Sequence, residues 1–280
     1  MSCYLITGGA GFFGTVLKQH LLKQGAECVS IDLEPDSFQH PRFTAYQGDI
    51  NDDSLMEKIF SVHKPEAVFH CAALLAHVKK DLKRLWHANV DGTRNVYDFA
   101  LKYGVKKIVF ISSNCLWAKN FDSPVTEDEE PNPVEIYGKS KLEGEKILLS
   151  QPDKINSIIF RSPTIMDEGR LGLLGILFEF IDEGRKLPMV GDGTNRYQFI
   201  YAKDLAKACE LALAADYSEI FNIGADDVKS FNEVYQYVIN KSGSGSRLFH
   251  FPKLPMIWAM KVCFWLGICL LYTSPSPRDA

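Results

Sequence analysis

Tyr137 and Lys141, four residues apart, form the pattern in this chain that is best suited to proton transfer. Both stand at the start of a helical pattern, so their side chains share one face of that helix. A phenol has a pKa of about 10, and an ammonium group about 4 Å away offsets roughly 4 kcal/mol of the cost of ionising it. Lys141 is therefore predicted to lower the pKa of Tyr137 enough for Tyr137 to act as a general acid and base.

The spacing alone is not specific, because it also occurs at Tyr103/Lys107 and Tyr237/Lys241. The first of these pairs runs from a helix end into a strand, and the second lies on a late helix. Tyr137 instead follows a predicted strand, Ile108–Ile111, whose end carries Ser113. Ligands of open parallel sheets bind beyond the carboxyl ends of the strands, so Ser113 is predicted to hold the oxygen of an alcohol that Tyr137 deprotonates.

Three glycines, Gly9, Gly11 and Gly14, follow the first predicted strand and open a helix. In that setting they let the backbone approach the pyrophosphate of a dinucleotide, which the helix N-terminus attracts. Asp32 ends the next strand, where its carboxylate can accept hydrogen bonds from ribose hydroxyls or, alternatively, cap a loop. A carboxylate repels a 2′-phosphate and no arginine lies within several residues, so NAD is favoured over NADP.

Apolar runs alternate with helical patterns through the first 160 residues. The predicted strands are Cys3–Ile6, Cys28–Ile31, Phe43–Tyr46, Ala67–His70, Ile108–Ile111 and Ser157–Phe160. The predicted helices are Gly14–Lys23, Asp53–Val62, Asn89–Lys102 and Tyr137–Leu149. This alternation predicts an α/β fold with a doubly wound parallel sheet of the Rossmann type, forming an NAD-binding domain over residues 1–160.

From Arg161 onward the pattern loosens, which predicts a smaller C-terminal substrate lobe over residues 161–271, partly interleaved with the sheet. Loops are expected near 167–172 and 187–195, and helices near 204–214 and 231–241. The stretch Arg170–Glu183 is apolar at helical spacing and is typical of lobe core or dimer surface.

Composition narrows the class of partner. The chain has 280 residues and a formal net charge of -4, and its basic residues are dispersed, which argues against nucleic acid and favours a small molecule. Its 7 cysteines form no C-x-x-C pair, so a reducing compartment and no structural metal are expected. The first residues lack a basic region before their short apolar run, so a cytoplasmic location is expected.

Residues Leu254–Leu271 form the most hydrophobic stretch of the chain. Lys261 interrupts it and it falls short of a span of about 20 residues, so a buried or interfacial helix is favoured over membrane contact. Tyr272–Ala280 turn abruptly polar and irregular, as expected for a disordered tail or a foreign end that replaces a lost C-terminus.

These landmarks, in this order, resemble the extended short-chain dehydrogenase/reductase family in its NAD-dependent epimerase/dehydratase branch. The resemblance runs from Cys3 to about Gly243 and includes Thr7–Gly14, Gly48–Ile50, His70–Ala73, Asn89–Thr93, Arg161 and Phe221–Gly224. It implies tightly bound NAD, a Ser113–Tyr137–Lys141 triad and a homodimer formed through helices within Trp86–Tyr103 and Tyr137–Leu149. The implied cofactor contacts are Gly8, Gly11, Phe12, Phe13, Gly14, Asp32, Asp49, Ile50, Ala72, Asn89, Tyr137 and Lys141. For Asp49, contact with the adenine edge and formation of a turn are both open.

The substrate half departs from the family pattern. The implied substrate contacts are Asn114, Arg161, Thr164 and Arg196. Sugar-nucleotide epimerases usually have an asparagine after Arg161, whereas this chain continues Ser162-Pro163-Thr164, and Arg196 is shifted by one place from the phosphate-binding arginine. The stretch from Gly191 to Tyr201, followed by an apolar segment, also resembles the hydroxysteroid dehydrogenase/isomerase relatives, whose C-terminal region touches membranes.

Three functions therefore stand open. The leading hypothesis is an NAD-dependent enzyme, an oxidoreductase, epimerase or dehydratase, that oxidises a secondary alcohol on a nucleotide-linked sugar. The second is a hydroxysteroid-type dehydrogenase acting on an apolar alcohol. The third is a non-catalytic NAD-sensing regulator, and the intact set of Ser113, Tyr137 and Lys141 argues against it.

Overall fold

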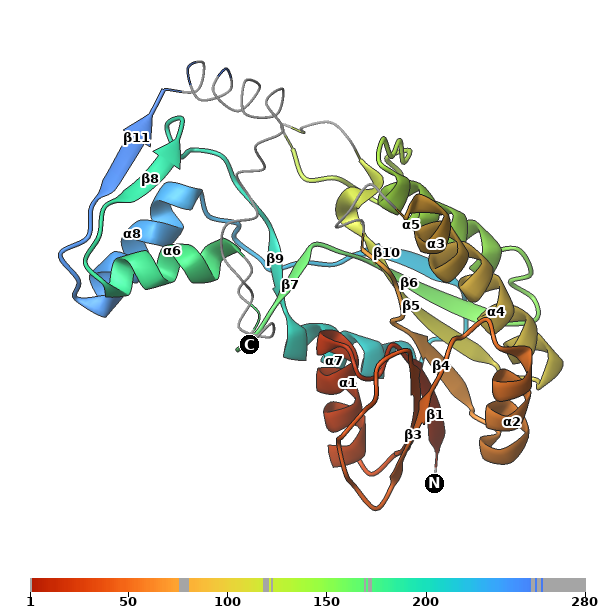
Figure 1. Ribbon diagram of the computed structural model, residues 1–280. Helices are drawn as coiled ribbons and strands as arrows, with labels where there is room; N and C mark the ends of the chain where they lie inside the picture. Colours follow the sequence, from red (N-terminus) through yellow and green to blue (C-terminus); the bar gives the residue numbers. More distant parts are fainter. Residues whose placement is uncertain are drawn as a thin grey trace. The chain divides into compact units, whose positions relative to one another are not determined.

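The apolar runs of the N-terminal half form a parallel sheet whose strands lie in the order β10-β6-β5-β4-β1-β2-β3. Every neighbouring pair is parallel, so the predicted doubly wound α/β fold is confirmed. The strands are β1 (Cys3–Thr7), β2 (Glu27–Asp32), β3 (Phe43–Gln47), β4 (Ala67–His70), β5 (Lys107–Ser113), β6 (Asn156–Ser162) and β10 (Glu219–Asn222). The computed structural model in Figure 1 describes residues 2–75, 81–117, 121, 123–168, 170, 173–252, 255 and 258.

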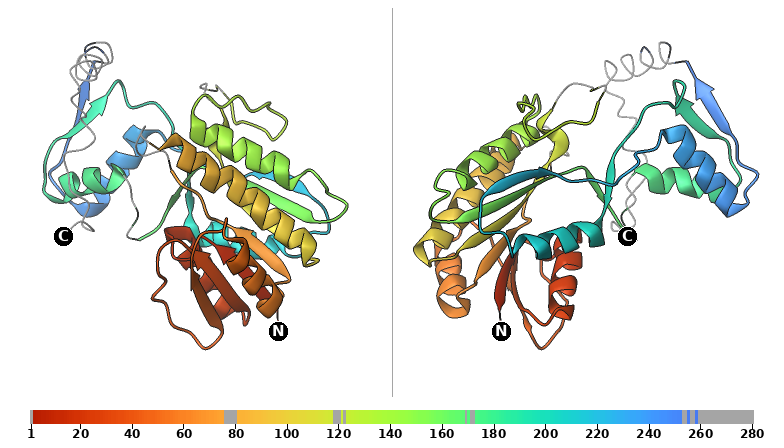
Figure 2. Two further views of the ribbon diagram at one scale, coloured as in Figure 1. Left: turned by 45° about the vertical axis from the view of Figure 1, so that its right-hand side comes forward. Right: turned by 180° about the vertical axis from the view of Figure 1, so that it is seen from behind.

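Helices cover both faces of this sheet (Figure 2). One face carries α1 (Phe12–Lys23) and α7 (Ala202–Ala212), and the other carries α2 (Asp53–His63), α4 (Gly92–Lys102) and α5 (Ile136–Leu148). Because neither face meets water, β4 and β5 are buried at every position.

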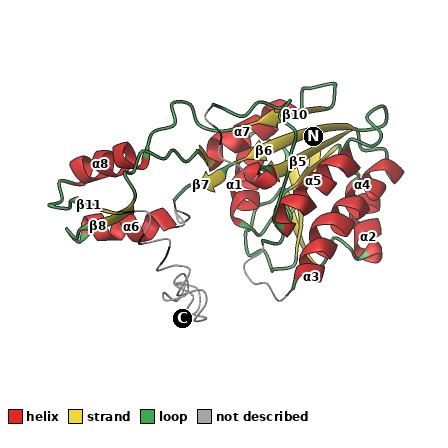
Figure 3. Cartoon of the chain, turned by 90° about the horizontal axis from the view of Figure 1, so that it is seen from above, coloured by secondary structure: helices red, strands yellow, loops and turns green. Residues whose placement is uncertain are grey.

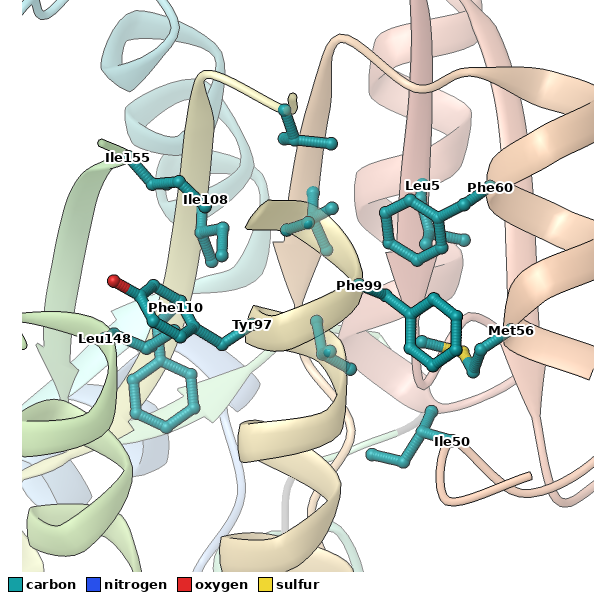
Figure 4. Packing of buried hydrophobic residues seen from close by; sticks show 14 of the residues in the cluster. Leu5, Ile50, Met56, Phe60, Tyr97, Phe99, Ile108, Phe110, Leu148 and Ile155 are labelled. Atoms are coloured by element: carbon teal, nitrogen blue, oxygen red, sulfur yellow. The ribbon is translucent and has the colours of Figure 1, made fainter. Parts of the chain in front are cut away.

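Figure 4 shows the core on the second face, where side chains of the sheet meet those of α2 and α4. Phe60 and Phe99 stack with ring centroids 5.8 Å apart, beside Leu5 of β1. Phe110 lies further along this core, near Tyr97, whose ring is also fully buried. This apolar layer packs α4 and α5 against the sheet and so fixes the positions of their side chains relative to the ends of the strands.

The predicted helix Asn89–Lys102 is the last part of a longer helical run. It begins with α3 (Leu82–Trp86), continues through a π-turn, η1 (His87–Asp91), and becomes α4. A π-turn inserts one extra residue into the helix, and such turns frequently occur at functional sites. Asn89 lies within this one.

The chain divides into two units, one of residues 1–170 and 198–225 and the other of residues 171–197 and 226–280. This division differs from the expected boundary at residue 160. The reason is that β10 pairs in parallel with β6, and β9 (Phe199–Tyr201) pairs with β7 (Thr164–Met166), so residues 198–225 return to the sheet.

The second unit contains α6 (Leu173–Asp182), β8 (Leu187–Val190), α8 (Phe231–Ser242) and β11 (Leu248–Phe251), seen by secondary structure in Figure 3. A capping box of Ser230 and Glu233 begins α8. The expectation of a loop through 187–195 is wrong at its start, because β8 pairs in parallel with β11. That partner is distant in the sequence, so no local pattern indicated the strand.

The predictions for Leu254–Leu271 and Tyr272–Ala280 fall almost entirely outside the described residues. Among the helices that the structure does describe, none has the length and apolar character needed to cross a membrane.

Candidate functional site

The segment Gly8–Gly14 joins β1 to α1 and leaves no room for a side chain at Gly8 or Gly14. Gly8 has a φ of +72°, and its N–H donates to the carbonyl oxygen of Ile31 at 2.8 Å. A Cβ on Gly14 would lie 2.2 Å from the carbonyl oxygen of Gly8, so this position excludes any side chain. Gly11 caps α1 without a side-chain bond, and the first turn holds no acidic residue. The helix N-terminus therefore keeps free N–H groups, which fit a dinucleotide pyrophosphate.

Asp32 lies at the end of β2 with its carboxylate fixed toward this turn. One oxygen accepts a hydrogen bond from the N–H of Ala10 at 2.9 Å, and the other accepts from the N–H of Glu34 at 3.1 Å. A carboxylate held there suits the ribose hydroxyls of NAD. The loop-capping alternative is also present in part, since the Glu34 bond is such a cap.

Lys18 is a supporting residue that the sequence analysis missed. It is buried in α1, donates to the carbonyl oxygen of Gly9 at 3.1 Å and pairs with Asp36 in the loop after β2. Its ammonium also lies 5.1 Å from the ring centroid of Phe38. The only signal in the sequence is a lysine on the apolar face of the helix that follows the glycine turn.

Four other expected cofactor residues make contacts within the protein. Asp49 accepts from the N–H and side-chain amide of Asn51 at 2.9 and 3.0 Å, which is the turn-forming alternative. Ile50 is buried against Gly92, and the side chain of Phe13 is buried in the core. Phe12 begins α1, and the guanidinium of Arg170 lies 5.0 Å from its ring centroid.

Ala72 and Asn89 also support the edge of the expected cofactor site. The N–H of Ala72 donates to Thr7 Oγ1 at 3.2 Å, and a Cβ on Gly8 would lie 2.8 Å from the Ala72 backbone. The buried amide of Asn89 accepts from the N–H of Leu74 at 2.7 Å and donates to its carbonyl oxygen at 3.0 Å. These bonds fix the segment that follows β4.

Ser113 lies at the carboxyl end of β5, and Tyr137 and Lys141 lie in the first two turns of α5. Ser113 is buried, and its Oγ accepts a hydrogen bond from the N–H of Cys115 at 3.2 Å. A Cβ on Gly138 would lie 2.3 Å from the carbonyl oxygen of Cys115, so the start of α5 packs directly on the segment after Ser113. This close approach brings the tyrosine to the serine.

The surroundings shift the pKa values of both titrating groups. Burial raises the pKa of Tyr137 to about 12, the thiol of Cys115 adds to this rise, and hydrogen bonding with Ser113 and the charge of Arg170 oppose it. Burial lowers the pKa of Lys141 to about 8, against the opposing effects of Cys71 and Glu145. Its ammonium lies 4.3 Å from the ring centroid of Phe110.

The expectation that Lys141 suffices to lower the pKa of Tyr137 is therefore wrong. Desolvation of the phenol outweighs the charges of the protein's own side chains, although Lys141, whose pKa is about 8, is still mostly protonated at pH 7. The Coulomb argument used the separation of the two groups but omitted the cost of removing the phenolate from water.

Arg161 is engaged elsewhere, which argues against the expected substrate contact. It is buried, and its guanidinium donates from Nη2 to Glu145 Oε2 at 2.8 Å and from Nε to both carboxylate oxygens at 3.1 and 3.2 Å. Glu145 also accepts from the hydroxyl of Ser112 at 2.5 Å. The pair thus ties α5 to β5 and β6 behind the Ser113–Tyr137–Lys141 set.

The remaining substrate candidates are exposed. Asn114 follows Ser113 as the first residue of a short 3-10 helix, η2 (Asn114–Leu116). Thr164 begins β7, and it is exposed in the same unit. Arg196 belongs to the second unit, where it forms an isolated β-bridge with Ser230.

Comparison with known proteins gives a family match over most of the chain. The profile of the NAD dependent epimerase/dehydratase family matches residues 4–224, which confirms the family expected from the sequence. A putative UDP-glucose 4-epimerase of Methanocaldococcus jannaschii is 30% identical over 264 residues, covering 89% of this chain and 86% of the relative. An uncharacterized protein of Sinorhizobium fredii, y4nG, is 36% identical over 267 residues, and the alignment covers 94% of this chain but only 66% of that longer protein.

Solved structures agree with this match. A UDP-glucose 4-epimerase of Thermotoga maritima, crystallised with UDP-glucose, has a TM-score of 0.78 and 27% identity, over 89% of this chain and 85% of the other. The Bordetella bronchiseptica enzyme WbmG, in complex with NAD and UDP, has a TM-score of 0.79 at 24% identity, covering 89% and 81% of the two chains. At that identity the second likeness concerns the fold alone.

Proposed function

The chain belongs to the NAD-dependent epimerase/dehydratase family and is an enzyme, and on that premise we propose that it oxidises a secondary alcohol of a nucleotide-linked sugar with bound NAD. The observation that supports this most is the gathering of Ser113, Tyr137 and Lys141 at the carboxyl edge of the same sheet that carries the glycine turn. A fold that only sensed a dinucleotide would have no need of that set.

The residues that would hold NAD fit it by their shape and charge. The Gly8–Gly14 backbone and the N-terminus of α1 would hold the pyrophosphate, and the carboxylate of Asp32 would hold a ribose. Bound NAD supplies a hydride acceptor for the alcohol carbon and, in its oxidised ring, a positive charge.

Ser113 donates a hydrogen bond to the substrate oxygen and Tyr137 takes the proton of the substrate hydroxyl at its own oxygen. Because the protein's side chains leave the pKa of Tyr137 at about 12, the phenol releases its proton readily only when a further positive charge is close. A positive charge near the phenol therefore favours its deprotonation. Lys141 lies in the same helix as Tyr137, and because burial lowers its pKa to about 8, its ammonium loses a proton more easily than that of an exposed lysine.

The substrate class rests on the relatives. Their names include UDP-glucose 4-epimerase and UDP-N-acetyl-alpha-D-glucosaminuronate decarboxylase, which act on sugars carried by a nucleotide. A putative dihydroflavonol 4-reductase is also similar, at 31% identity over 58% of this chain, so the panel of substrates must include alcohols without a nucleotide.

The experiment combines a substrate panel with two tyrosine variants. The wild-type protein is incubated with NAD and with UDP-, GDP- and dTDP-sugars, sterols and flavonols, and the products are separated chromatographically. On the substrate that is converted, Tyr137→Phe is expected to lose about 10²- to 10⁴-fold in kcat, the usual contribution of a positioned acid or base.

Tyr237→Phe is the matched control, because Tyr237 has the same spacing to a lysine but is 63% exposed on α8. It should keep its rate. Turnover of sterols or flavonols but of no nucleotide sugar would overturn the substrate class, and undiminished turnover by Tyr137→Phe would overturn the role of Tyr137.

A further inference from the structure

A chain of hydrogen bonds runs through His70, a fully buried histidine at the carboxyl end of β4. Its Nδ1 lies 2.7 Å from Thr7 Oγ1, and its Nε2 lies 2.8 Å from Thr93 Oγ1. The imidazole also stacks on Phe110, with ring centroids 5.3 Å apart. The chemistry proposed above uses none of these contacts, so the histidine needs its own explanation.

The neighbouring bonds allow a single tautomer of His70. Thr93 Oγ1 donates its proton to the carbonyl oxygen of Asn89 at 2.6 Å, so it must accept from the Nε2–H of His70. Nδ1 is then the acceptor, and it receives the hydroxyl proton of Thr7, whose oxygen accepts in turn from the N–H of Ala72. Every polar atom in this chain has a partner only in that arrangement.

The same tautomer persists because the ring does not take up a proton. Burial, with the nearby ammonium of Lys141, lowers the pKa of His70 to about 3. A protonated ring would donate from both nitrogens, so Thr7 Oγ1 would have to accept from Nδ1 as well as from Ala72, and its own hydroxyl proton would lose the acceptor that Nδ1 provides.

Both ends of this series of hydrogen bonds reach the proposed site. At one end Thr7 immediately precedes Gly8, the first residue of the dinucleotide turn. At the other end Asn89, in the π-turn, donates from Nδ2 to Ser140 Oγ at 3.0 Å, and Ser140 donates to the carbonyl oxygen of Tyr137 at 2.8 Å. The path thus joins the turn that would hold NAD to the first turn of α5.

A second contact links His70 to Lys141. Phe110 lies between them, stacked on the imidazole and 4.3 Å from the Lys141 ammonium to its ring centroid. Holding the imidazole at both nitrogens therefore also holds the ring beneath the lysine.

We propose that His70 is a positioning residue, whose two hydrogen bonds set the distance and orientation between the dinucleotide turn and the α5 turn that carries Tyr137 and Lys141. This inference rests on the proposed function, because it assigns His70 a task in the same reaction. His70 touches no reacting group, and it acts through Thr7 on one side and through Thr93, Asn89 and Ser140 on the other.

Thr93 offers a clean test, because two variants separate its hydroxyl from its shape. Thr93→Val keeps the volume and removes the acceptor of the His70 bond, while Thr93→Ser keeps the hydroxyl and removes a methyl group. Thr93→Val is expected to lose about 10- to 100-fold in kcat, the cost of a small misplacement of reacting groups, and Thr93→Ser to recover most of it. KM and the Kd for NAD should stay within about threefold, because binding contacts are unchanged.

Tyr97→Phe is the matched control for a polar group lost from the same helix. Tyr97 lies one turn after Thr93, is fully buried, and its hydroxyl has no hydrogen-bond partner among the described residues. Its kcat should equal that of the wild type. If Thr93 had a purely structural role, kcat of the Thr93 variants would fall in step with their melting temperatures, whether or not the hydroxyl is present. That result would overturn the proposal.

A second readout does not require turnover. Nitrogen-15 NMR of the ring nitrogens should show His70 neutral with its proton on Nε2 from about pH 5 to 8, identified by the loss of its signals in His70→Asn. A ring that titrates in this range, or that carries its proton on Nδ1, contradicts the inference. Absence of any NAD-dependent turnover in the wild type would overturn the proposed function, while a wild-type rate retained by Thr93→Val would overturn only the role of His70.

Discussion

Replacing Glu145 by glutamine tests what the buried ion pair with Arg161 does for this fold. The two side chains are 3% and 4% exposed, and they connect α5 to β6 behind Lys141. Glutamine has the same shape and can still accept from the hydroxyl of Ser112, so the change removes the charge and little else. Arg161 then stays buried with its positive charge uncompensated.

The size of the effect follows from that burial. Breaking a buried ion pair by removing one partner costs about 3 to 5 kcal/mol, because the remaining charge has lost both its counter-ion and its water. Glutamine retains an oxygen that can face the guanidinium, so we expect a value near the lower end, about 3 kcal/mol. This is a large share of the stability of a typical domain.

Urea denaturation at pH 7, followed by circular dichroism, measures the loss as a fall in the midpoint at unchanged slope. Glu143→Gln is the matched control on the same helix. Glu143 is 38% exposed and pairs with Lys146 at 3.4 Å, an exposed pair that contributes about 0.5 kcal/mol or less.

If Glu145→Gln unfolds no more easily than Glu143→Gln, the buried-charge reasoning is refuted. The double variant Glu145→Met with Arg161→Met adds a second check. Removing both charges leaves no unpaired charge and only the Ser112 hydroxyl loses its acceptor, so most of the lost stability should return.

Two further predictions concern buried polar groups in the first unit. Tyr97→Phe removes a buried hydroxyl without a partner among the described residues, so it should leave stability unchanged or raise it by about 1 kcal/mol in urea denaturation, and a clear loss would mean that the hydroxyl has a partner. His70 has a pKa of about 3 in the fold against an ordinary 6.5, so between these values the unfolded chain binds a proton that the folded protein does not, and stability falls as the pH is lowered through this window. Denaturation at several pH values should therefore show that His70→Gln loses about 1.4 kcal/mol per pH unit of this dependence, and an unchanged slope would show that His70 is accessible to protons in the folded state.

The glycine turn was predictable because its requirement is local. Gly8 and Gly14 sit where backbone atoms approach too closely for a Cβ, and Asp32 follows from the end of the next strand. The positions of the six N-terminal strands along the chain were predictable from short apolar runs separated by helical patterns. β8 and β10 were not found, because short strands gain their identity from partners that lie far away in the sequence.

The types and spacing of Ser113, Tyr137 and Lys141 singled them out as the proposed catalytic set, because the end of one strand and the start of the next helix place them at one edge of the sheet. The sequence by itself thus determined the fold class and the tight glycine turn, since both depend on patterns among residues that lie close together in the sequence.

Only the tertiary structure decided the electrostatics and the contacts of single side chains. It brought Glu145 to Arg161, which removes the guanidinium from the expected substrate contact, and it buried the phenol of Tyr137, which raises its pKa to about 12. It also closed the hydrogen bonds on both nitrogens of His70 from two other elements. Desolvation and long-range pairing depend on which elements pack together, and no local pattern of residues encodes that.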